Sequence, residues 1–300
     1  MTRTPRPVGA LLSALWCFMP LGLGVLGGCA ALCAGGCLME SPRFTRSLQT
    51  SAPASADLGL SVQTNNGSIT ISRGAEAMCH AAARVRALSQ ARADAVQVTI
   101  TRADGALVVQ VVWPEGGRKN AEGCDLEIRV PGSAWVRAGS DNGSVSAQGL
   151  AGVAELSTSN GIVTLRDHDG AATLTTSNGA IEGARVTGAC KVHTTNGGIT
   201  LVDIGGFVDA SSTNGAFDLA LTPENPGPVE VRTTNAPVRV RVGGSFAGTL
   251  VADTTNGSIR LPKGPTTSDL QKHAELRTAR AGKDSHIRTT NGDVTIFQGE

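Results

Sequence analysis

The sequence predicts an all-β protein: a parallel β-solenoid, that is, a single-stranded β-helix, with an N-terminal β-rich cap. A short phrase ending in Asn-Gly, usually preceded by Thr or Ser, recurs from residue 142 onward, and apolar residues alternate with polar ones on both sides of each copy. A repeat of near-constant length is typical of a solenoid, in which each unit stacks on the next. Alternation with a period of two is typical of strands that bury one face. We take the coil as right-handed, although the sequence itself does not determine its handedness.

The asparagine of each phrase marks its place in the repeat. The markers advance by 18 residues four times (142, 160, 178, 196, 214), then by 21 twice (235, 256) and finally by 35 (291). Glycine follows every marker except Asn235, which Ala236 follows. Asn-Gly often forms a hairpin, but the even spacing favours strands that pair with their equivalents one rung away. We therefore expect the markers to form a structural corner, with glycine at positive φ and the asparagines hydrogen-bonded along the stack. They are Asn142, Asn160, Asn178, Asn196, Asn214, Asn235, Asn256 and Asn291.

The pattern divides the chain into four parts. Residues 1–28 read as a lipoprotein signal peptide, 29–57 as a flexible tether, 58–131 as the cap segment and 132–300 as the solenoid. The cap segment holds an earlier copy of the phrase and a predicted hairpin around Asp104-Gly105, and it covers the open edge of the stack. Two stretches enlarge the regular unit: the proline-rich residues 221–228 and residues 262–285, which suit either a helix or a further strand.

The N-terminal residues predict export. Arg3 and Arg6 precede a mostly apolar stretch that ends in Leu-Gly-Gly-Cys at Cys29. This tetrapeptide resembles a bacterial lipobox, which implies that Cys29 carries the lipid; Cys37 is a second candidate, and an uncleaved signal anchor is the alternative. We expect a protein anchored to the cell envelope, with the outer membrane favoured if there is one, because Ala30 rather than Asp follows Cys29.

The cysteines beyond the signal are Cys79, Cys124 and Cys190. In an oxidising compartment Cys79 and Cys124 could form a disulfide, although sequence cannot determine the pairing. The chain has no CxxC motif and no stacked carboxylates at its corners, so neither zinc nor calcium is supported. We expect no metal and no cofactor.

Composition narrows the class of partner. The formal net charge is +1, so general attraction to nucleic acid is not expected. Aromatic residues make up 3% of the chain and tyrosine is absent, which leaves few rings for stacking on bases or sugars.

The densest polar triplet is Asp167-His168-Asp169. Polysaccharide hydrolases use paired carboxylates for acid and base catalysis, but the residues one rung further on are not acidic, so we interpret the triplet as a solvated turn. The outward threonine columns are interrupted by charged residues such as Arg232 and Asp253, which excludes a flat ice-binding face. No catalytic residue is assigned.

Units of the form Leu-x-Thr-Ser-Asn-Gly-x-Ile-x-Leu, a strand ending in DLEIRVP and the export signal together resemble a bacterial family of unknown function labelled putative adhesin. The resemblance covers about residues 58–300 and implies an envelope protein without known catalytic residues. The resulting hypothesis is a non-enzymatic cell-envelope lipoprotein that acts as an adhesin-like binder or a structural β-solenoid. Its expected partners are an unknown envelope glycan or protein and, through the lipid, a membrane. The alternatives are an enzyme that acts on an envelope polysaccharide and a sensor of envelope stress.

Overall fold

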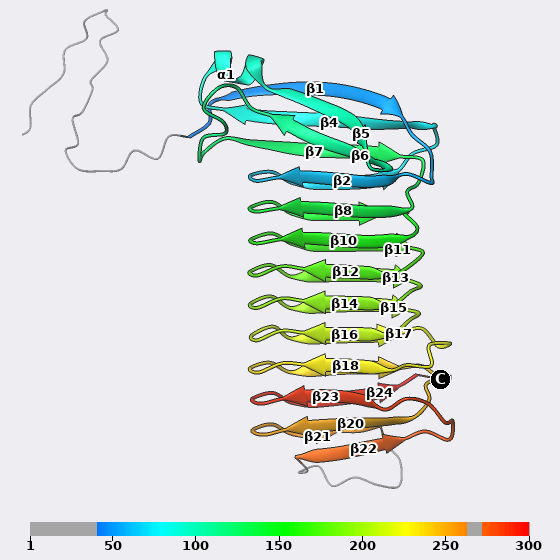
Figure 1. The fold of residues 1–300 in the computed structure, drawn as a ribbon. Coiled ribbons are helices and arrows are strands. Elements are labelled where there is room, and N and C mark those ends of the chain that lie inside the picture. The colour runs from blue at the N-terminus through cyan, green and yellow to red at the C-terminus, as the bar shows by residue number, and fades with distance from the viewer. Residues whose placement is uncertain (1–40, 263–271, 300) are drawn as a thin grey trace, which may run out of the picture. The chain divides into compact units, whose positions relative to one another are not determined.

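The computed structural model describes residues 41–262 and 272–299. The predicted signal peptide, Cys29 and Cys37 lie outside the described residues. Within them the chain is nearly all β, with parallel strands stacked in two long sheets (Figure 1), so the predicted β-solenoid class is confirmed.

Two 12-stranded sheets form the stack. In spatial order, sheet A contains β1 (Phe44–Pro53), β4 (Met78–Ala87), β7 (Gly123–Val130), β3 (Ile69–Arg73), β9 (Val145–Gln148), β11 (Val163–His168), β13 (Ile181–Val186), β15 (Ile199–Ile204), β17 (Phe217–Leu221), β19 (Val238–Val242), β24 (Val294–Gln298) and β21 (Ile259–Arg260). Sheet B contains β22 (His273–Arg277), β20 (Thr249–Thr254), β23 (Ser285–Thr289), β18 (Val229–Arg232), β16 (Val208–Ser211), β14 (Cys190–His193), β12 (Ala172–Thr175), β10 (Val153–Thr158), β8 (Trp135–Ser140), β2 (Gly59–Thr64), β6 (Ala106–Val112) and β5 (Gln97–Ala103).

Each rung of the stack consists of one strand from each sheet. The Asn-Gly corner joins the two strands in most rungs, whereas Asn235-Ala236 joins β18 to β19 and residues 113–122 join β6 to β7. In the rung of β10 and β11, Leu156 pairs in register with Leu174 of the next rung, and Val163 pairs with Ile181. Equivalent apolar side chains therefore lie directly above one another between the two sheets, and all four of these are buried. Burial of one such side chain stabilises the fold by about 1.5–3 kcal/mol, so the apolar columns hold the two sheets together.

At both ends of the stack, the order of rungs in space differs from their order in the chain. At the N-terminal end, β2 and β3 lie between the rung of β8 and β9 and the outer rung of β6 and β7. At the C-terminal end, β23 and β24 lie between the rung of β18 and β19 and the outer rung of β20 and β21. Residues 59–73 are thus a full rung rather than part of a cap, because Leu60 and Ile69 continue the apolar columns opposite Val136 and Val145. The expected boundary near residue 131 divides the stack itself.

Antiparallel strands cover the N-terminal ends of both sheets and the C-terminal end of sheet B. β4 pairs with β7 and β1 with β4 at one end, and β22 pairs with β20 at the other. The tether predicted over residues 29–57 is therefore wrong for residues 44–53, which form β1. This strand has no buried apolar column, and its pairing with β4 depends on the backbone, so its composition reads as linker. Residues 262–285 suited either a helix or a strand, and the structure has a strand there, β22. Part of this segment lies outside the described residues.

Two local features of the cap follow from sequence. β5 and β6 form the predicted hairpin, with Asp104 at φ 49° and Gly105 at φ 74°, as a tight two-residue turn requires. The helix α1 (Gln90–Ala95) is capped by Ser89, whose side chain accepts a hydrogen bond from the backbone N–H of Arg92.

Across residues 41–262 and 272–299, no helix has the length and apolar character needed to cross a membrane.

The buried carboxylate of Glu122 ties α1 to the cap. It accepts two hydrogen bonds of 2.7 Å from the Arg92 guanidinium, one of 2.9 Å from the backbone of Lys119 and one of 3.2 Å from the backbone of Leu88. The hydrogen bonds from Arg92 lower the pKa of Glu122 to about 2, against the opposing effect of burial. Glu122 was not expected from the sequence as a buried anion, because its charged partner Arg92 is 30 residues away in the chain.

Candidate functional surface

The asparagine markers form a continuous ladder of side-chain amides along one edge of the stack. The Nδ2 of Asn160 donates to the Oδ1 of Asn142 at 2.8 Å, and the Nδ2 of Asn178 donates to the Oδ1 of Asn160 at 2.8 Å. The same bond, at 2.6–2.8 Å, joins every neighbour in the spatial order Asn66, Asn142, Asn160, Asn178, Asn196, Asn214, Asn235, Asn291 and Asn256. A primary amide has two N–H donors and an oxygen with two lone pairs. Most of these exposed amides therefore retain a donor and an acceptor for a ligand.

In most rungs a buried hydroxyl bonds to the backbone of the neighbouring corner from inside the stack. Thr194 is fully buried; its Oγ1 donates to the carbonyl of Gly179 in the neighbouring rung at 3.1 Å and accepts from the backbone N–H of Gly197 at 3.3 Å. No role was expected for these hydroxyls from the sequence. They lie two residues before the marker and therefore face the same side of the strand as the buried apolar columns. This shared face was the signal in the sequence that they would be buried. The column comprises Ser140, Thr158, Thr176, Thr194, Ser212, Thr233, Thr254 and Thr289, all buried.

The glycine after the marker has a different role from the one expected. These glycines are not at positive φ. Instead the backbones stack so closely that a Cβ on Gly197 would lie 1.7 Å from the carbonyl oxygen of Gly179, and one on Gly179 would lie 1.7 Å from that of Gly161. Glycine is required by this close approach. In the rung with Ala236 in its place, the corner hydroxyl of Thr233 has no hydrogen-bond partner among the described residues.

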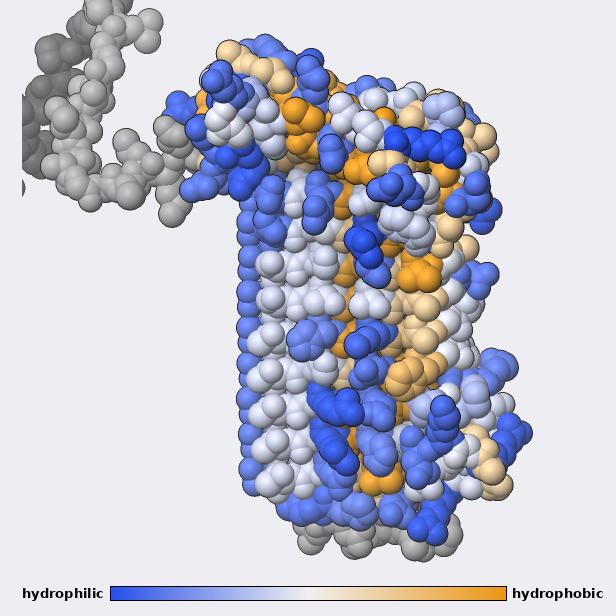
Figure 2. All heavy atoms as spheres, in the orientation of Figure 1, coloured by the Kyte–Doolittle hydropathy of each residue, from blue (hydrophilic) through white to orange (hydrophobic). Residues whose placement is uncertain are grey.

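A column of outward hydroxyls runs beside the amide ladder on the sheet B side. Its members directly precede the markers and are exposed: Ser159, Ser177, Thr195, Thr213, Thr234, Thr290 and Thr255. We call the amide ladder and this hydroxyl column together the polar ridge. Figure 2 shows a hydrophilic strip along the edge where the corners lie and a paler strip beside it. The ridge offers hydrogen-bonding groups that repeat at the strand spacing of about 4.8 Å.

The Asp167-His168-Asp169 triplet does not converge on a common point. Asp167 is paired with Arg185 (Oδ2 to Nη2, 3.1 Å), and this hydrogen-bonded guanidinium lowers the pKa of the carboxyl. Asp169 accepts from the hydroxyl of Thr187 at 2.7 Å. The interpretation of the triplet as a solvated turn is wrong for His168. Its ring is buried, and its Nε2 lies 3.1 Å from the carbonyl oxygen of Gly152.

The possible disulfide between Cys79 and Cys124 is not formed in the structure, where both thiols are free and buried. In the β4–β7 pair Val85, rather than Cys79, lies opposite Cys124. Cys79 is therefore displaced along β4 by roughly 20 Å, far beyond the reach of a disulfide. Burial raises the pKa of Cys79 to about 11 and those of Cys124 and Cys190 to about 12.

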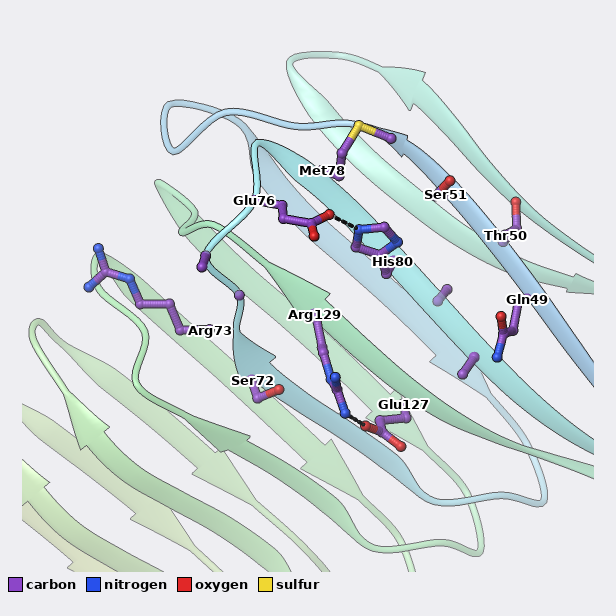
Figure 3. Close-up of a pocket in the computed structure, with 14 residues that line it drawn as sticks. Gln49, Thr50, Ser51, Ser72, Arg73, Glu76, Met78, His80, Glu127 and Arg129 are labelled. Carbon is purple, nitrogen blue, oxygen red and sulfur yellow. Dashed lines mark hydrogen bonds and ion pairs between the residues drawn. The ribbon is translucent and has the colours of Figure 1, made fainter.

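A depression with a volume of about 950 Å³ lies on the outward face of β1, β4, β7 and β3 (Figure 3). A hydrogen bond and an ion pair line it: His80 Nε2 lies 2.9 Å from a Glu76 carboxylate oxygen, and Arg129 pairs with Glu127 at 2.7 Å. Each carboxylate is thus engaged by a side chain close to it in sequence. Among the described residues, no group of three or more His, Cys, Asp or Glu side chains is arranged to hold a metal ion.

Comparison with known proteins places the repeats in a family. The model of the Toastrack DUF4097 family matches residues 120–297. A putative adhesin from Bacteroides fragilis has a TM-score of 0.45 at 11% identity, over 85% of this chain and 97% of its own. A putative adhesin from Parabacteroides merdae has a TM-score of 0.40 at 12% identity, over the same shares of the two chains. No curated protein sequence matches the chain.

Proposed function

The chain belongs to the Toastrack DUF4097 family, which confirms the resemblance to an adhesin-like family. We propose that the protein is a non-enzymatic envelope protein that binds an extended envelope glycan along the polar ridge. The observation that carries this proposal is the amide ladder with its adjoining hydroxyl column. Both present the same groups rung after rung along one edge.

The ridge is suited to weak contacts made many times. A net hydrogen bond contributes only about 0.5–1.5 kcal/mol, so one rung cannot hold a ligand. An extended polymer with repeating hydroxyl or amide groups can engage several rungs at once. The amides are already held by their neighbours, so little side-chain entropy is lost on binding.

The binding test compares two exposed threonines, one on the polar ridge and one away from it. Thr195 lies on the ridge and Thr200 on the outward face of sheet A, and both are exposed. With soluble peptidoglycan fragments and envelope polysaccharides as probes, we expect saturable binding without turnover. Thr195→Arg is expected to weaken it at least tenfold and Thr200→Arg to leave it unchanged. Product formation would support the enzyme alternative. Equal effects of both variants would show that the ridge is not the binding site.

We further propose that the lipid on Cys29 anchors the protein to the envelope, in the outer membrane where one exists. The support is the sequence Leu-Gly-Gly-Cys after the apolar stretch. Mass spectrometry of the mature N-terminus is expected to find a diacylglyceryl modification that Cys29→Ala abolishes and Cys37→Ala retains. The opposite pattern would assign the lipid to Cys37, and an unmodified, uncleaved N-terminus would identify a signal anchor.

A further inference from the structure

Three arginines gather on the outward face of sheet A near the C-terminal end of the stack. Arg239 and Arg241 lie on β19 and Arg260 on β21, and all three are exposed. With Thr295 and Phe297 of the intervening β24 they line a depression of about 390 Å³. The register places Thr295 beside Arg239 on one side and beside Arg260 on the other.

Within the described residues, these arginines differ from several others on the solenoid in having no ion-paired acidic partner. Arg137 pairs with Glu155 at 2.7 Å, and Arg288 with Asp253 at 3.7 Å. Among residues 41–262 and 272–299, no carboxylate forms an ion pair with any of the three arginines.

Two carboxylates lie near the cluster, and neither is within ion-pair distance of its arginines. Asp218 borders the depression and is beside Arg239 in register. Asp293, near Arg260, accepts hydrogen bonds from the backbone N–H and the hydroxyl of Ser258 at 2.8 and 2.9 Å. The depression is therefore lined by three guanidinium groups and one carboxylate.

The spacing allows the three side chains to reach a common ligand. Neighbouring strands are about 4.8 Å apart, so the backbones at Arg239 and Arg260 are separated by roughly 10 Å, with Thr295 between them. Arg241 lies two residues from Arg239 on the same face, and its guanidinium is 6.0 Å from the centre of the Phe297 ring. This stacking restrains one guanidinium at the edge of the depression.

We propose that this arginine cluster binds the carboxylate or phosphate groups of an acidic polysaccharide. A guanidinium presents a planar pair of N–H donors that matches these anions, and unpaired cations in a depression raise the local concentration of a polyanion. A polysaccharide is favoured over a lipid headgroup because Phe297 is a single exposed ring, and insertion into a bilayer interface needs a larger apolar face.

The cluster is a second site, and its proposal does not rest on the polar ridge. Sheet A carries the cluster, whereas the hydroxyl column of the ridge lies on the sheet B side. Failure of one site therefore does not imply failure of the other, and variants of each can be measured with the same preparation.

The test measures binding of polygalacturonate and of a phosphorylated dextran at low salt, with neutral dextran and phosphatidylglycerol vesicles as comparisons. We expect at least one acidic polysaccharide to bind, with affinity falling as salt is raised. The double variant Arg239→Gln/Arg260→Gln is expected to lose at least tenfold in affinity, and Arg137→Gln, on sheet B, to lose none. Circular dichroism checks that both variants fold.

Three results would overturn the proposal. The first is no binding of either acidic polysaccharide by the wild-type chain, and the second is an equal loss in the sheet B control. The third is tighter binding to the vesicles than to the polysaccharides, which would identify the cluster as a membrane contact.

Discussion

Replacing Thr194 by valine tests the hydroxyl that staples the corner. The substitution keeps the branched shape of the side chain and removes only its hydrogen-bonding group. Two buried backbone groups then lose their partner: the carbonyl of Gly179, now 3.1 Å from Oγ1, and the N–H of Gly197, 3.3 Å from it.

The magnitude follows from those two groups. A buried polar group left without a partner costs about 1–3 kcal/mol. Part of this is offset because valine avoids the cost of burying a hydroxyl. We expect Thr194→Val to lower the free energy of unfolding by about 2–4 kcal/mol.

Two other threonines serve as controls in the same urea-unfolding assay. Thr195 is exposed, so its replacement by valine should change stability by no more than about 0.5 kcal/mol. Thr233 is buried, but its hydroxyl has no partner, so valine there should be neutral or stabilising. If Thr233→Val cost as much as Thr194→Val, or if Thr194→Val cost less than about 1 kcal/mol, the staple would not contribute as described.

Three further changes test other parts of the structure. Gly197→Ala should lower the free energy of unfolding by about 3 kcal/mol or more, because its Cβ would lie 1.7 Å from a backbone oxygen. Ala236→Gly should lower it by at most about 1 kcal/mol. Similarly small losses of stability for both variants in thermal unfolding would contradict the close stacking. The folded pKa of Glu122, about 2, is below its unfolded value, so its contribution of about 3 kcal/mol is present at neutral pH and is lost as pH falls from about 4.5 towards 2. Glu122→Gln should remove that pH dependence, and a pH-independent difference between the two proteins would refute it. Cys190, whose pKa burial raises to about 12, should resist alkylation near pH 8 until urea unfolds the chain; rapid labelling of the folded protein would show that the core opens locally.

Much of the architecture is readable from the sequence because each rung repeats the same pattern. A two-residue alternation on both sides of a fixed asparagine specifies two strands and the direction in which each faces, and the registered pairs of Leu156 and Val163 follow that pattern. The stacking order of the last rungs is not readable in the same way. The rungs of Asn256 and Asn291 carry the same phrase, and the chain between them is long enough for either to stack beside Asn235; the structure places Asn291 there.

The remaining errors arise where contacts override local pattern. β1 is polar, so it reads as linker, yet its backbone pairs with β4. His168 lies in a polar triplet, but its position is equivalent to that of buried Val186 in the next rung. The arginine cluster depends on the spatial order β19, β24, β21, which brings Arg260 close to Arg239. That adjacency follows from the exchanged rungs and not from any repeat of the sequence.

The most direct test of the polar ridge is to follow the asparagine side-chain amides by NMR while envelope glycan fragments are added. Binding along the ridge predicts that several ladder amides shift together, among them those of Asn160, Asn178 and Asn196, with smaller changes on the outward face of sheet A. Shifts confined to the depression around His80 and Arg129, or saturable binding that leaves the ladder amides unchanged, would contradict the account.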